Sequence, residues 1–404
     1  MQNNVSNSMK QCDCFVIGAG LVGLATAYQL LKERPHLKLI VGEKEIKPAQ
    51  HQSGRNSGVV HSGIYYKPGS QKAKNCMQGR ADLLKYCQES RLPILPIHKV
   101  IVAQTPREEA YLEELQQRAK ANGVPGVQVV GPDRLKEIEP HVRAAQALYL
   151  PQCQVVDYQA VAESLCNTIE KMGGEVIFGE KILDLQKNTV IGSRNCYQPR
   201  VTINCAGLFS DRLAKIFMGS IEHRICPFRG EYYLLSENKR SLVKGMIYPV
   251  PDPRFPFLGV HLTPMVNGRV EAGPNAVLAL AREGYRRSDF KFGDMGELLA
   301  FPGFWIMAAR YWKAGMYEMA RSFSKTLFVK DVQRLVPDIE DRDLVRGGAG
   351  IRAQVIKRDG SLMDDFAILE DQRSIHVINA PSPAATACFS IGRTIAGKAM
   401  ARLA

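Results

Sequence analysis

Three glycines near the start of the chain have the spacing of a phosphate-binding turn. Gly18, Gly20 and Gly23 form a GxGxxG pattern between a short apolar run and a stretch with helical spacing. The first glycine permits a tight turn, the second lets the backbone approach a pyrophosphate, and the third allows close helix–strand packing. The N-terminus of the helix offers N–H groups and a positive dipole end to the phosphates. The pattern therefore predicts a dinucleotide site.

The residues after this turn extend the predicted site. Glu43 ends the next apolar run, where a carboxylate can accept hydrogen bonds from ribose hydroxyls and disfavours a 2′-phosphate. The glycine pattern alone does not separate NAD from FAD. A polar, glycine-rich loop from Ser53 to Tyr66 follows, and such a loop can line a flavin that extends away from the pyrophosphate. Its apolar residues, among them Val59 and Val60, make an ordinary surface loop the weaker interpretation.

Seven short stretches carry a resemblance that is more specific than the glycine pattern. They are His51–Gly58, His61–Tyr66, Arg229–Tyr233, Phe257–His261, Gly273–Val277, Gly350–Gln354 and Ala380–Thr386. In these stretches the chain resembles the D-amino-acid-oxidase and glycerol-3-phosphate-dehydrogenase superfamily of flavoproteins. Within it, the chain is similar to the L-2-hydroxyglutarate dehydrogenase/oxidase family from about residue 12 to about residue 402.

The resemblance implies FAD as the cofactor and the oxidation of L-2-hydroxyglutarate to 2-oxoglutarate, with electrons passed to a quinone or to oxygen. Sibling flavoproteins act on glycerol 3-phosphate, malate or an amino acid, and these substrates stay open. A non-catalytic FAD-binding protein is the alternative from another class. Some members attach FAD covalently through a histidine early in this loop. Because Ser53, Gly54 and Arg55 hold the nearby positions, we expect non-covalent FAD, and only His51 leaves a covalent link open.

The resemblance also implies cofactor contacts later in the chain. Ile182 lies where a strand backbone holds the adenine, and Ala206 and Gly207 lie in a strand-end turn beside FAD. Thr386 is expected in the first turn of the final helix, whose N-terminus can stabilise negative charge on the reduced flavin. The predicted cofactor-binding residues are Gly18, Gly20, Gly23, Glu43, Lys44, Ser53, Asn56, Ser57, Val59, Ile182, Ala206, Gly207, Gly350, Ala385 and Thr386.

Two histidines are candidates for the catalytic base. Oxidation of a C–OH group needs a base for the hydroxyl proton and an acceptor for the hydride on C2. A histidine suits the first role because its pKa lies near neutral pH. His61 follows the cofactor loop and matches a histidine of the similar glycerol-3-phosphate dehydrogenase stretch, and His261 lies in the presumed substrate sheet. The sequence does not choose between them, and a structural role is the alternative for each.

A carboxylate substrate calls for a cation, preferably the two-pronged guanidinium of arginine. Arg352 stands where the superfamily often places a carboxylate-binding arginine, with an ion pair between domains as the alternative. A second carboxylate needs a second cluster, and the candidates are Arg229, Tyr65, Tyr232 and Tyr248. No metal constellation is visible, and neither a nucleophile elbow nor paired carboxylates indicate hydrolysis.

The elements that would position these residues can be read from the spacing of apolar side chains. Cys14–Ile17, the helical spacing after it and Leu37–Val41 predict a strand–helix–strand unit with a right-handed crossover. Residues 1–11 are polar, and we expect them to be frayed. The pattern at 158–172 predicts a helix, the alternation at 225–275 predicts an antiparallel sheet, and a final helix is expected from about Pro383 to Leu403.

The predicted fold is α/β, with a Rossmann-like FAD-binding domain and an inserted, mainly antiparallel substrate domain. Chains longer than roughly 250–300 residues usually divide into two domains, and this chain has 404. The predicted FAD-binding domain comprises residues 1–90, 150–220 and 335–404, and the predicted substrate domain comprises residues 91–149 and 221–334.

The charge balance of the chain indicates which classes of binding partner to expect. Lys and Arg total 53 against 40 Asp and Glu, and the net charge of +13 favours a dicarboxylate substrate, an anionic membrane surface or nucleic acid. We predict no nucleic-acid partner, because no long basic run or nucleic-acid motif is present. The ten cysteines match no zinc spacing and predict reduced thiols in the cytoplasm. No transmembrane span or cleavage site is predicted.

One segment could still contact a membrane. Residues 287–325 contain both tryptophans and many other aromatic residues, interleaved with Lys and Arg. That composition is typical of an interfacial helix on anionic lipid. We therefore consider peripheral contact with the inner face of the cytoplasmic membrane. The alternative is a helix that packs on the sheet and leaves its basic face in water.

Overall fold

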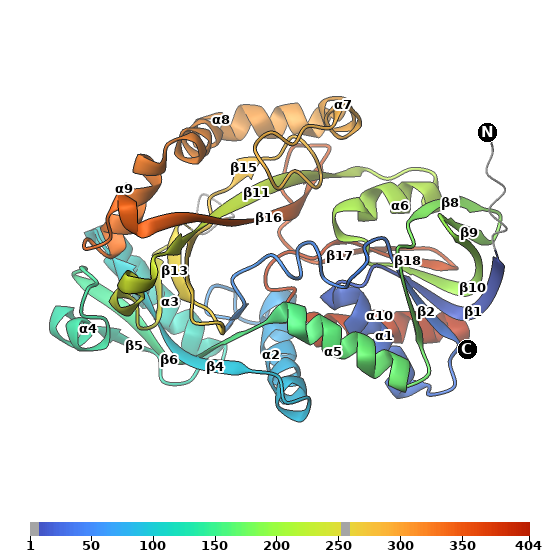
Figure 1. Ribbon diagram of the computed structural model, residues 1–404, viewed down its shortest axis with the longest axis horizontal. Coiled ribbons are helices and arrows are strands. Elements are labelled where there is room, and N and C mark those ends of the chain that lie inside the picture. Colours follow the sequence, from blue (N-terminus) through green and yellow to red (C-terminus); the bar gives the residue numbers. More distant parts are fainter. Residues whose placement is uncertain (1–7, 252–258) are drawn as a thin grey trace.

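The computed structural model describes residues 8–251 and 259–404, and they form two β-sheets that lie side by side with helices around them (Figure 1). Phe257 and Leu258, at the start of one of the resembling stretches, lie outside the described residues. The first strand begins at Ser8, so the expectation of a frayed segment through residue 11 was wrong for residues 8–11. These residues pair with residues 195–198 of another strand.

The first sheet has the parallel order of a nucleotide-binding fold. Its strands follow the order β17-β18-β10-β1-β2-β7, and every pairing from β18 to β7 is parallel. β17 is an antiparallel edge strand, and β8 and β9 form a hairpin beside β10. The strands are β1 (Ser8–Ile17), β2 (Leu39–Glu43), β7 (Glu175–Phe178), β8 (Ile182–Gln186), β9 (Thr189–Gly192), β10 (Asn195–Asn204), β17 (Ala367–Glu370) and β18 (Ser374–Asn379).

Helices cover both faces of the first sheet. On one face α1 (Leu21–Glu33) packs against α5 (Tyr158–Lys171) and α10 (Cys388–Leu403), and α2 (Gln71–Glu89) packs on α10. The buried core of this face includes Leu24 of α1 and Ile203 of β10. On the other face α6 (Ser210–Met218) packs through Leu213 near Phe15. The predicted strand–helix–strand unit is thus β1-α1-β2. β1 has β2 on one side and β10 on the other, so the strand order reverses at β1.

The second sheet is almost wholly antiparallel. Its order is β15-β11-β14-β13-β12-β4-β6-β3, with β16 on β11 and β5 on β6, and only β12 and β4 pair in parallel. The strands are β3 (Val59–Val60), β4 (Ile94–Ala103), β5 (Gln128–Val130), β6 (Gln146–Val156), β11 (His223–Leu235), β12 (Met246–Pro249), β13 (His261–Pro264), β14 (Val270–Gly273), β15 (Val277–Leu278) and β16 (Leu344–Lys357).

Helices also pack on both faces of the second sheet. Alternate side chains of β4 point to opposite faces: Val100 and Val102 pack toward α9 (Lys325–Leu335) and α4 (Pro132–Ile138), whereas Ile101 and Ala103 pack toward α3 (Pro106–Ala121). α7 (Phe292–Leu299) and α8 (Pro302–Phe323) run along the outer rim, at the top of Figure 1.

The predicted fold class is confirmed: a parallel α/β layer is combined with a mainly antiparallel sheet. The domain ranges stay a prediction. Two strands of the second sheet cross into ranges that were assigned to the FAD-binding domain: β6 extends into residues 150–156, and β16 lies wholly within residues 335–404. The final helix begins at Cys388 rather than near Pro383, because residues 381–387 form successive turns closed by hydrogen bonds from Ala384 N to Pro381 O and from Ala387 N to Pro383 O.

Candidate active site

The glycine turn between β1 and α1 has no room for side chains. Gly18 has φ +105°, and a Cβ on it would lie 2.6 Å from the carbonyl oxygen of Cys205. A Cβ on Gly23 would lie 2.1 Å from the carbonyl oxygen of Gly18. The N–H of Gly18 donates to the carbonyl of Gly42 at 2.8 Å, which ties the turn to β2. The turn, β2 and the N-terminus of α1 therefore form one rigid unit.

Glu43, at the end of β2, and Ser53, in the loop that follows, both hydrogen-bond to this unit. The buried carboxylate of Glu43 accepts hydrogen bonds from Ala19 N at 2.8 Å and from Glu45 N at 2.9 Å. Each oxygen accepts one of these bonds, so each keeps a lone pair for a further donor. The Ser53 hydroxyl accepts a hydrogen bond from Leu21 N at 3.0 Å, which fixes the loop against the first turn of α1.

A cavity of about 1640 Å³ runs from this turn to the second sheet. It exceeds the roughly 300–1,000 Å³ of an ordinary small-molecule pocket, so it can hold a dinucleotide and a small substrate together. Most predicted residues line it. These are Gly18, Gly20, Glu43, Lys44, Ser53, Asn56, Ser57, Val59, Ile182, Ala206, Gly207, Gly350 and Ala385 from the cofactor set, with His61, Tyr65, Tyr232, Tyr248, His261 and Arg352 from the catalytic and substrate sets.

His61 lies directly after β3, where two contacts hold it. Its backbone N–H donates to Oγ1 of Thr386 at 3.0 Å, and its Nε2 lies 3.2 Å from the Ser382 hydroxyl. Burial, with a smaller contribution from the charge of Lys99, lowers the pKa of His61 to about 4. The ring is therefore neutral near pH 7 and can accept a proton.

His261 opens β13 and is held in a defined orientation. Its Nδ1 lies 2.9 Å from the carbonyl oxygen of Gly259. Because a carbonyl only accepts hydrogen bonds, this contact assigns the hydrogen to Nδ1 and leaves Nε2 as an acceptor. The ring stacks on Tyr248, with centroids 3.9 Å apart and planes at 20°. Burial, followed by the charges of Lys99 and Arg352, lowers the pKa of His261 to about 3.

A cation and several hydroxyls share this end of the cavity. Arg352 on β16 donates to the carbonyl of Asn275 at 3.2 Å, and burial lowers its pKa. The charge of Arg352 acts on the nearby Tyr232 and partly offsets the burial that raises the pKa of Tyr232 to about 12. The buried hydroxyl of Tyr65 has no hydrogen-bond partner among the described residues. Two neutral imidazoles, a guanidinium and tyrosine hydroxyls suit a small hydroxy acid.

Three predicted residues do not line the cavity. Arg229 donates to the carbonyls of Gly284 and Arg286 and is paired with Glu231, so it supports the second sheet, and we drop it from the substrate set. Thr386 was expected in the first turn of the final helix and lies before that helix. It is fully buried, and its hydroxyl binds His61 N and Tyr158. Gly23 does not line the cavity either, but its lack of a side chain lets α1 pack closely against the Gly18 turn.

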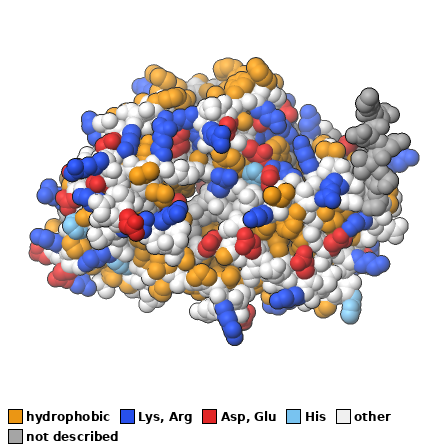
Figure 2. Space-filling view, viewed as in Figure 1, with side chains coloured by type: hydrophobic (Ala, Val, Ile, Leu, Met, Phe, Trp, Pro, Cys, Tyr) orange, Lys and Arg blue, Asp and Glu red, His pale blue; other side chains and the backbone are white. Residues whose placement is uncertain are grey.

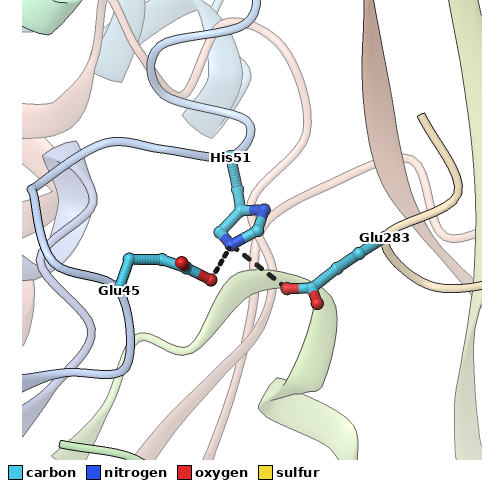
Figure 3. A group of neighbouring side chains, drawn as sticks. All are labelled: Glu45, His51 and Glu283. Carbon is cyan, nitrogen blue, oxygen red and sulfur yellow. Dashed lines mark hydrogen bonds and ion pairs between the residues drawn. The ribbon is translucent and has the colours of Figure 1, made fainter. Parts of the chain in front are cut away.

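An ion network lies on the cavity wall between the two sheets. Figure 3 shows the carboxylates of Glu45, from the segment after β2, and Glu283, which lies after β15, both pointing at the His51 ring. Their ligand atoms lie within 4.8 Å of one another, a spacing that could hold a metal ion. The ammonium of Lys44, however, pairs with both carboxylates and lies 2.8 Å from His51 Nε2. We therefore assign no metal and interpret the cluster as an ionic contact between the two parts of the molecule.

Comparison with known proteins identifies the family. The model of the family described as "FAD dependent oxidoreductase" matches residues 13–398, which is nearly the whole chain. The chain belongs to the FAD-dependent oxidoreductase family. The family resemblance indicated by the seven sequence stretches is thereby confirmed.

Relatives within the FAD-dependent oxidoreductases share one named activity. The L-2-hydroxyglutarate dehydrogenase of Indibacter alkaliphilus is 47% identical, over 96% of this chain and 98% of its own. The human mitochondrial L-2-hydroxyglutarate dehydrogenase is 41% identical, over 98% of this chain and 90% of its own. Among solved structures, the dithionite-reduced L-α-glycerophosphate oxidase of Mycoplasma pneumoniae with FAD bound has a TM-score of 0.78 at 22% identity, over 98% of this chain and 95% of its own. That likeness concerns the fold.

The described residues fit the cofactor of an FAD-dependent oxidoreductase. The turn at Gly18 and Gly20 lets a pyrophosphate approach the N-terminus of α1, and Glu43 keeps lone pairs for ribose hydroxyls. The loop at Ser53–Ser57 continues the cavity toward β16, where Gly350 lies so close that a Cβ would be 2.3 Å from the carbonyl oxygen of Arg55. Non-covalent attachment stays a prediction, and the engagement of the His51 ring by the ion network supports it.

Two residues at the substrate end of the cavity were missed. Ser382 contacts His61, and Lys99 lies on β4 behind the cavity wall. Ser382 gave no signal beyond its place in a resembling stretch. Lys99 did give one: apart from its neighbour His98, it is the polar residue in a strand of apolar residues, and it shares a face of the sheet with Ile97 and Ile101.

Proposed function

We propose that the chain oxidises L-2-hydroxyglutarate to 2-oxoglutarate. The proposal rests on the observation that Arg352, His61 and His261 line the same cavity. The chain is also similar over nearly its full length to L-2-hydroxyglutarate dehydrogenases. Bound FAD would supply the acceptor for the hydride that leaves C2. The protein would supply a site for the carboxylates, a base for the hydroxyl proton and a wall that excludes water.

Each of these roles falls to particular side chains. Arg352 offers its planar fork to a carboxylate. His261 is the favoured base, because its Nδ1 is already engaged and its Nε2 is an acceptor inside the cavity. His61 stays the second candidate, since its Nε2 is shared with Ser382. Tyr65 can donate its unpartnered hydroxyl to the substrate.

A substrate panel tests this proposal against its alternatives. Turnover with a dye as electron acceptor would be measured on L-2-hydroxyglutarate, its D isomer, L-malate, glycerol 3-phosphate and a set of amino acids. We expect preference for L-2-hydroxyglutarate, with 2-oxoglutarate as the product. Preference for another compound would assign the chain to a sibling activity, and turnover of none would favour a non-catalytic FAD-binding protein.

Arg352→Met is expected to lower kcat/KM for L-2-hydroxyglutarate by roughly 10- to 150-fold, mostly through KM. The physical reason is the loss of a charge-assisted hydrogen bond to the carboxylate, worth about 1.5–3 kcal/mol. Arg352→Lys keeps the charge but loses the fork, so it should recover only part of the loss.

The matched control is Arg346→Met on the same strand, because Arg346 is exposed and outside the cavity lining. It should leave both constants within about twofold of the wild type, as expected for a surface position. Unchanged KM in Arg352→Met, with flavin content intact, would show that another residue binds the carboxylate.

A membrane surface is the partner that we propose besides the substrate. Along α7 and α8 an apolar face is exposed, which we call the α7–α8 face; it comprises Phe292, Trp305, Trp312, Met316 and Phe323. Phe292 is 85% and Trp312 59% exposed. Figure 2 shows orange side chains gathered over α7 and α8 at the top, with blue side chains beside them.

Charge and geometry favour an anionic bilayer as the surface that this face contacts. Lys291 and Lys313 flank the apolar residues, and Arg310 and Tyr311 of the same helix line the cavity. A lipid-soluble quinone would thus arrive beside the cavity, whereas oxygen needs no such contact. Among the helices of residues 8–251 and 259–404, none is long and apolar enough to span a membrane. We propose peripheral contact from the cytoplasmic side.

Trp312→Glu combined with Met316→Glu is expected to lower binding to anionic vesicles by at least about tenfold, since burial of one large apolar side chain contributes roughly 1.5–3 kcal/mol. Co-sedimentation with vesicles that contain an anionic lipid measures this. Ile46→Glu is the control, because Ile46 is 82% exposed and follows β2 of the first sheet, outside the α7–α8 face. Equal binding by all three proteins, or binding that ignores added salt, would contradict the proposal.

A further inference from the structure

Lys99 is a buried lysine with no carboxylate beside it among the residues that the structure describes. It lies in the middle of β4, opposite Leu150 of β6 and Met246 of β12, and its relative exposure is 4%. Within the described parts of the chain, no carboxylate lies within ion-pair distance of its Nζ. An unpaired ammonium in a protein interior is costly. Its presence in a strand whose other residues, apart from His98, are apolar therefore calls for a reason.

The ammonium of Lys99 lies between two aromatic rings of the cavity wall. Its Nζ is 3.6 Å from the ring centroid of Tyr248 and 4.7 Å from that of Tyr65. Tyr248 in turn stacks on His261. Both tyrosines and His261 line the cavity, whereas Lys99 does not. The charge thus lies one layer behind the substrate end, separated from it by aromatic rings.

The groups that face Lys99 add little negative charge. They are Cys153 on β6, Tyr248 on β12, His261 on β13, and His61, Tyr65 and Tyr66 in the segment after β3. Burial raises the pKa values of these tyrosines and of Cys153, so they are neutral near pH 7. With the two histidines also neutral, Lys99 and Arg352 give this end of the cavity a positive field.

We propose that Lys99 is a positioning residue whose buried charge, acting through the Tyr248–His261 stack, selects a doubly charged ligand over a singly charged one. This inference rests on the proposed function and adds a second cation for the second carboxylate. Arg352 contacts one carboxylate, and the field of Lys99 compensates the remaining negative charge.

The pH dependence of ligand binding follows with a definite sign. Burial lowers the pKa of Lys99 to about 7. A bound dianion favours the protonated form and raises that pKa, so affinity is highest below about pH 7 and falls as the pH rises through it. A rise of one to two units in the pKa on binding corresponds to a roughly 10- to 100-fold loss of affinity.

The test is binding of 2-oxoglutarate to the oxidised holoenzyme, followed by perturbation of the flavin spectrum at about pH 6 and about pH 9. For the wild type we expect a roughly 10- to 100-fold weaker Kd at the higher pH. Lys99→Met should bind weakly at both pH values. Lys99→Arg should bind tightly at both, because arginine keeps its charge there. A monocarboxylate such as 2-oxobutyrate should show a smaller difference between wild type and Lys99→Met.

The outcomes separate this inference from the proposed function. Thermal unfolding and flavin content show whether each variant is folded, and methionine is expected to be tolerated because it replaces a buried charge by an apolar chain. If the wild type binds 2-oxoglutarate with a Kd that does not change with pH, or if folded Lys99→Met retains the wild-type pH dependence, the inference is overturned. If the wild type binds no 2-oxoglutarate at either pH, the proposed function fails and the inference fails with it.

Discussion

Gly23→Ala is expected to give a protein that retains little or no flavin. The added Cβ would lie 2.1 Å from the carbonyl oxygen of Gly18 and 3.3 Å from the Cβ of Cys205. The nearer neighbour is backbone, which cannot rotate away, so α1 must move away from β1 or the Gly18 turn must change. Either movement displaces the N-terminus of α1, which is the group that meets the pyrophosphate. The loss should therefore appear in cofactor affinity before it appears in the fold.

The measurement is the visible flavin absorbance per protein after purification, with the Kd for FAD added back. Gly397→Ala in α10 is the matched control, because it is also a helical glycine and no heavy atom lies within 4 Å of its added Cβ. It should keep full flavin content and gain about 0.5–1 kcal/mol of stability. Wild-type flavin content and affinity in Gly23→Ala would refute the assignment of this turn as the pyrophosphate site.

His261→Gln is expected to lower the rate of flavin reduction by L-2-hydroxyglutarate roughly 10²- to 10⁴-fold, the usual contribution of a general base. The reason is that the contact of Nδ1 with the carbonyl of Gly259 leaves Nε2 as a hydrogen-bond acceptor. Rapid mixing without oxygen measures this rate at saturating substrate. His61→Gln is the comparison, and if His61 is instead the base the two effects will be reversed. Near-wild-type rates in both variants would exclude an imidazole base.

The pH dependence of the same rate gives an independent check. A base must be unprotonated to act, and burial lowers the pKa of His261 to about 3 and that of His61 to about 4. Activity that depends on either ring is therefore present above about pH 4 and lost as the pH falls through these values. We expect a saturated rate that stays flat from about pH 8 down to about pH 5. An acid limb near the ordinary histidine pKa of about 6.5 would contradict this.

The cofactor end of the site could be predicted because its signals are local. A turn at Gly18 and a strand that ends at Glu43 lie within one strand–helix–strand unit, so the spacing in sequence fixes the spacing in space. The antiparallel second sheet was predicted from its alternation for a similar reason. The family resemblance then supplied the positions of His61, His261 and Arg352, which come from three different segments and share no local pattern.

The remaining features depend on packing that no local pattern records. Thr386 was expected at a helix N-terminus, but the turns before α10 make it a buried hydroxyl that holds His61 instead. Arg229 has the charge that a substrate site needs, yet its guanidinium is used by the carbonyls of Gly284 and Arg286. The position of Lys99 behind two tyrosines follows from pairings between β4, β6 and β12, which only the folded chain brings together.

The central claim is tested most directly by an anaerobic visible spectrum of the purified holoenzyme before and after addition of L-2-hydroxyglutarate, with D-2-hydroxyglutarate, L-malate and glycerol 3-phosphate as controls. We predict that the L isomer bleaches the oxidised flavin band and that the controls do not, with 2-oxoglutarate formed in an amount equal to the flavin reduced. A flavin band that L-2-hydroxyglutarate leaves unchanged, or that a control bleaches instead, would contradict the proposed function.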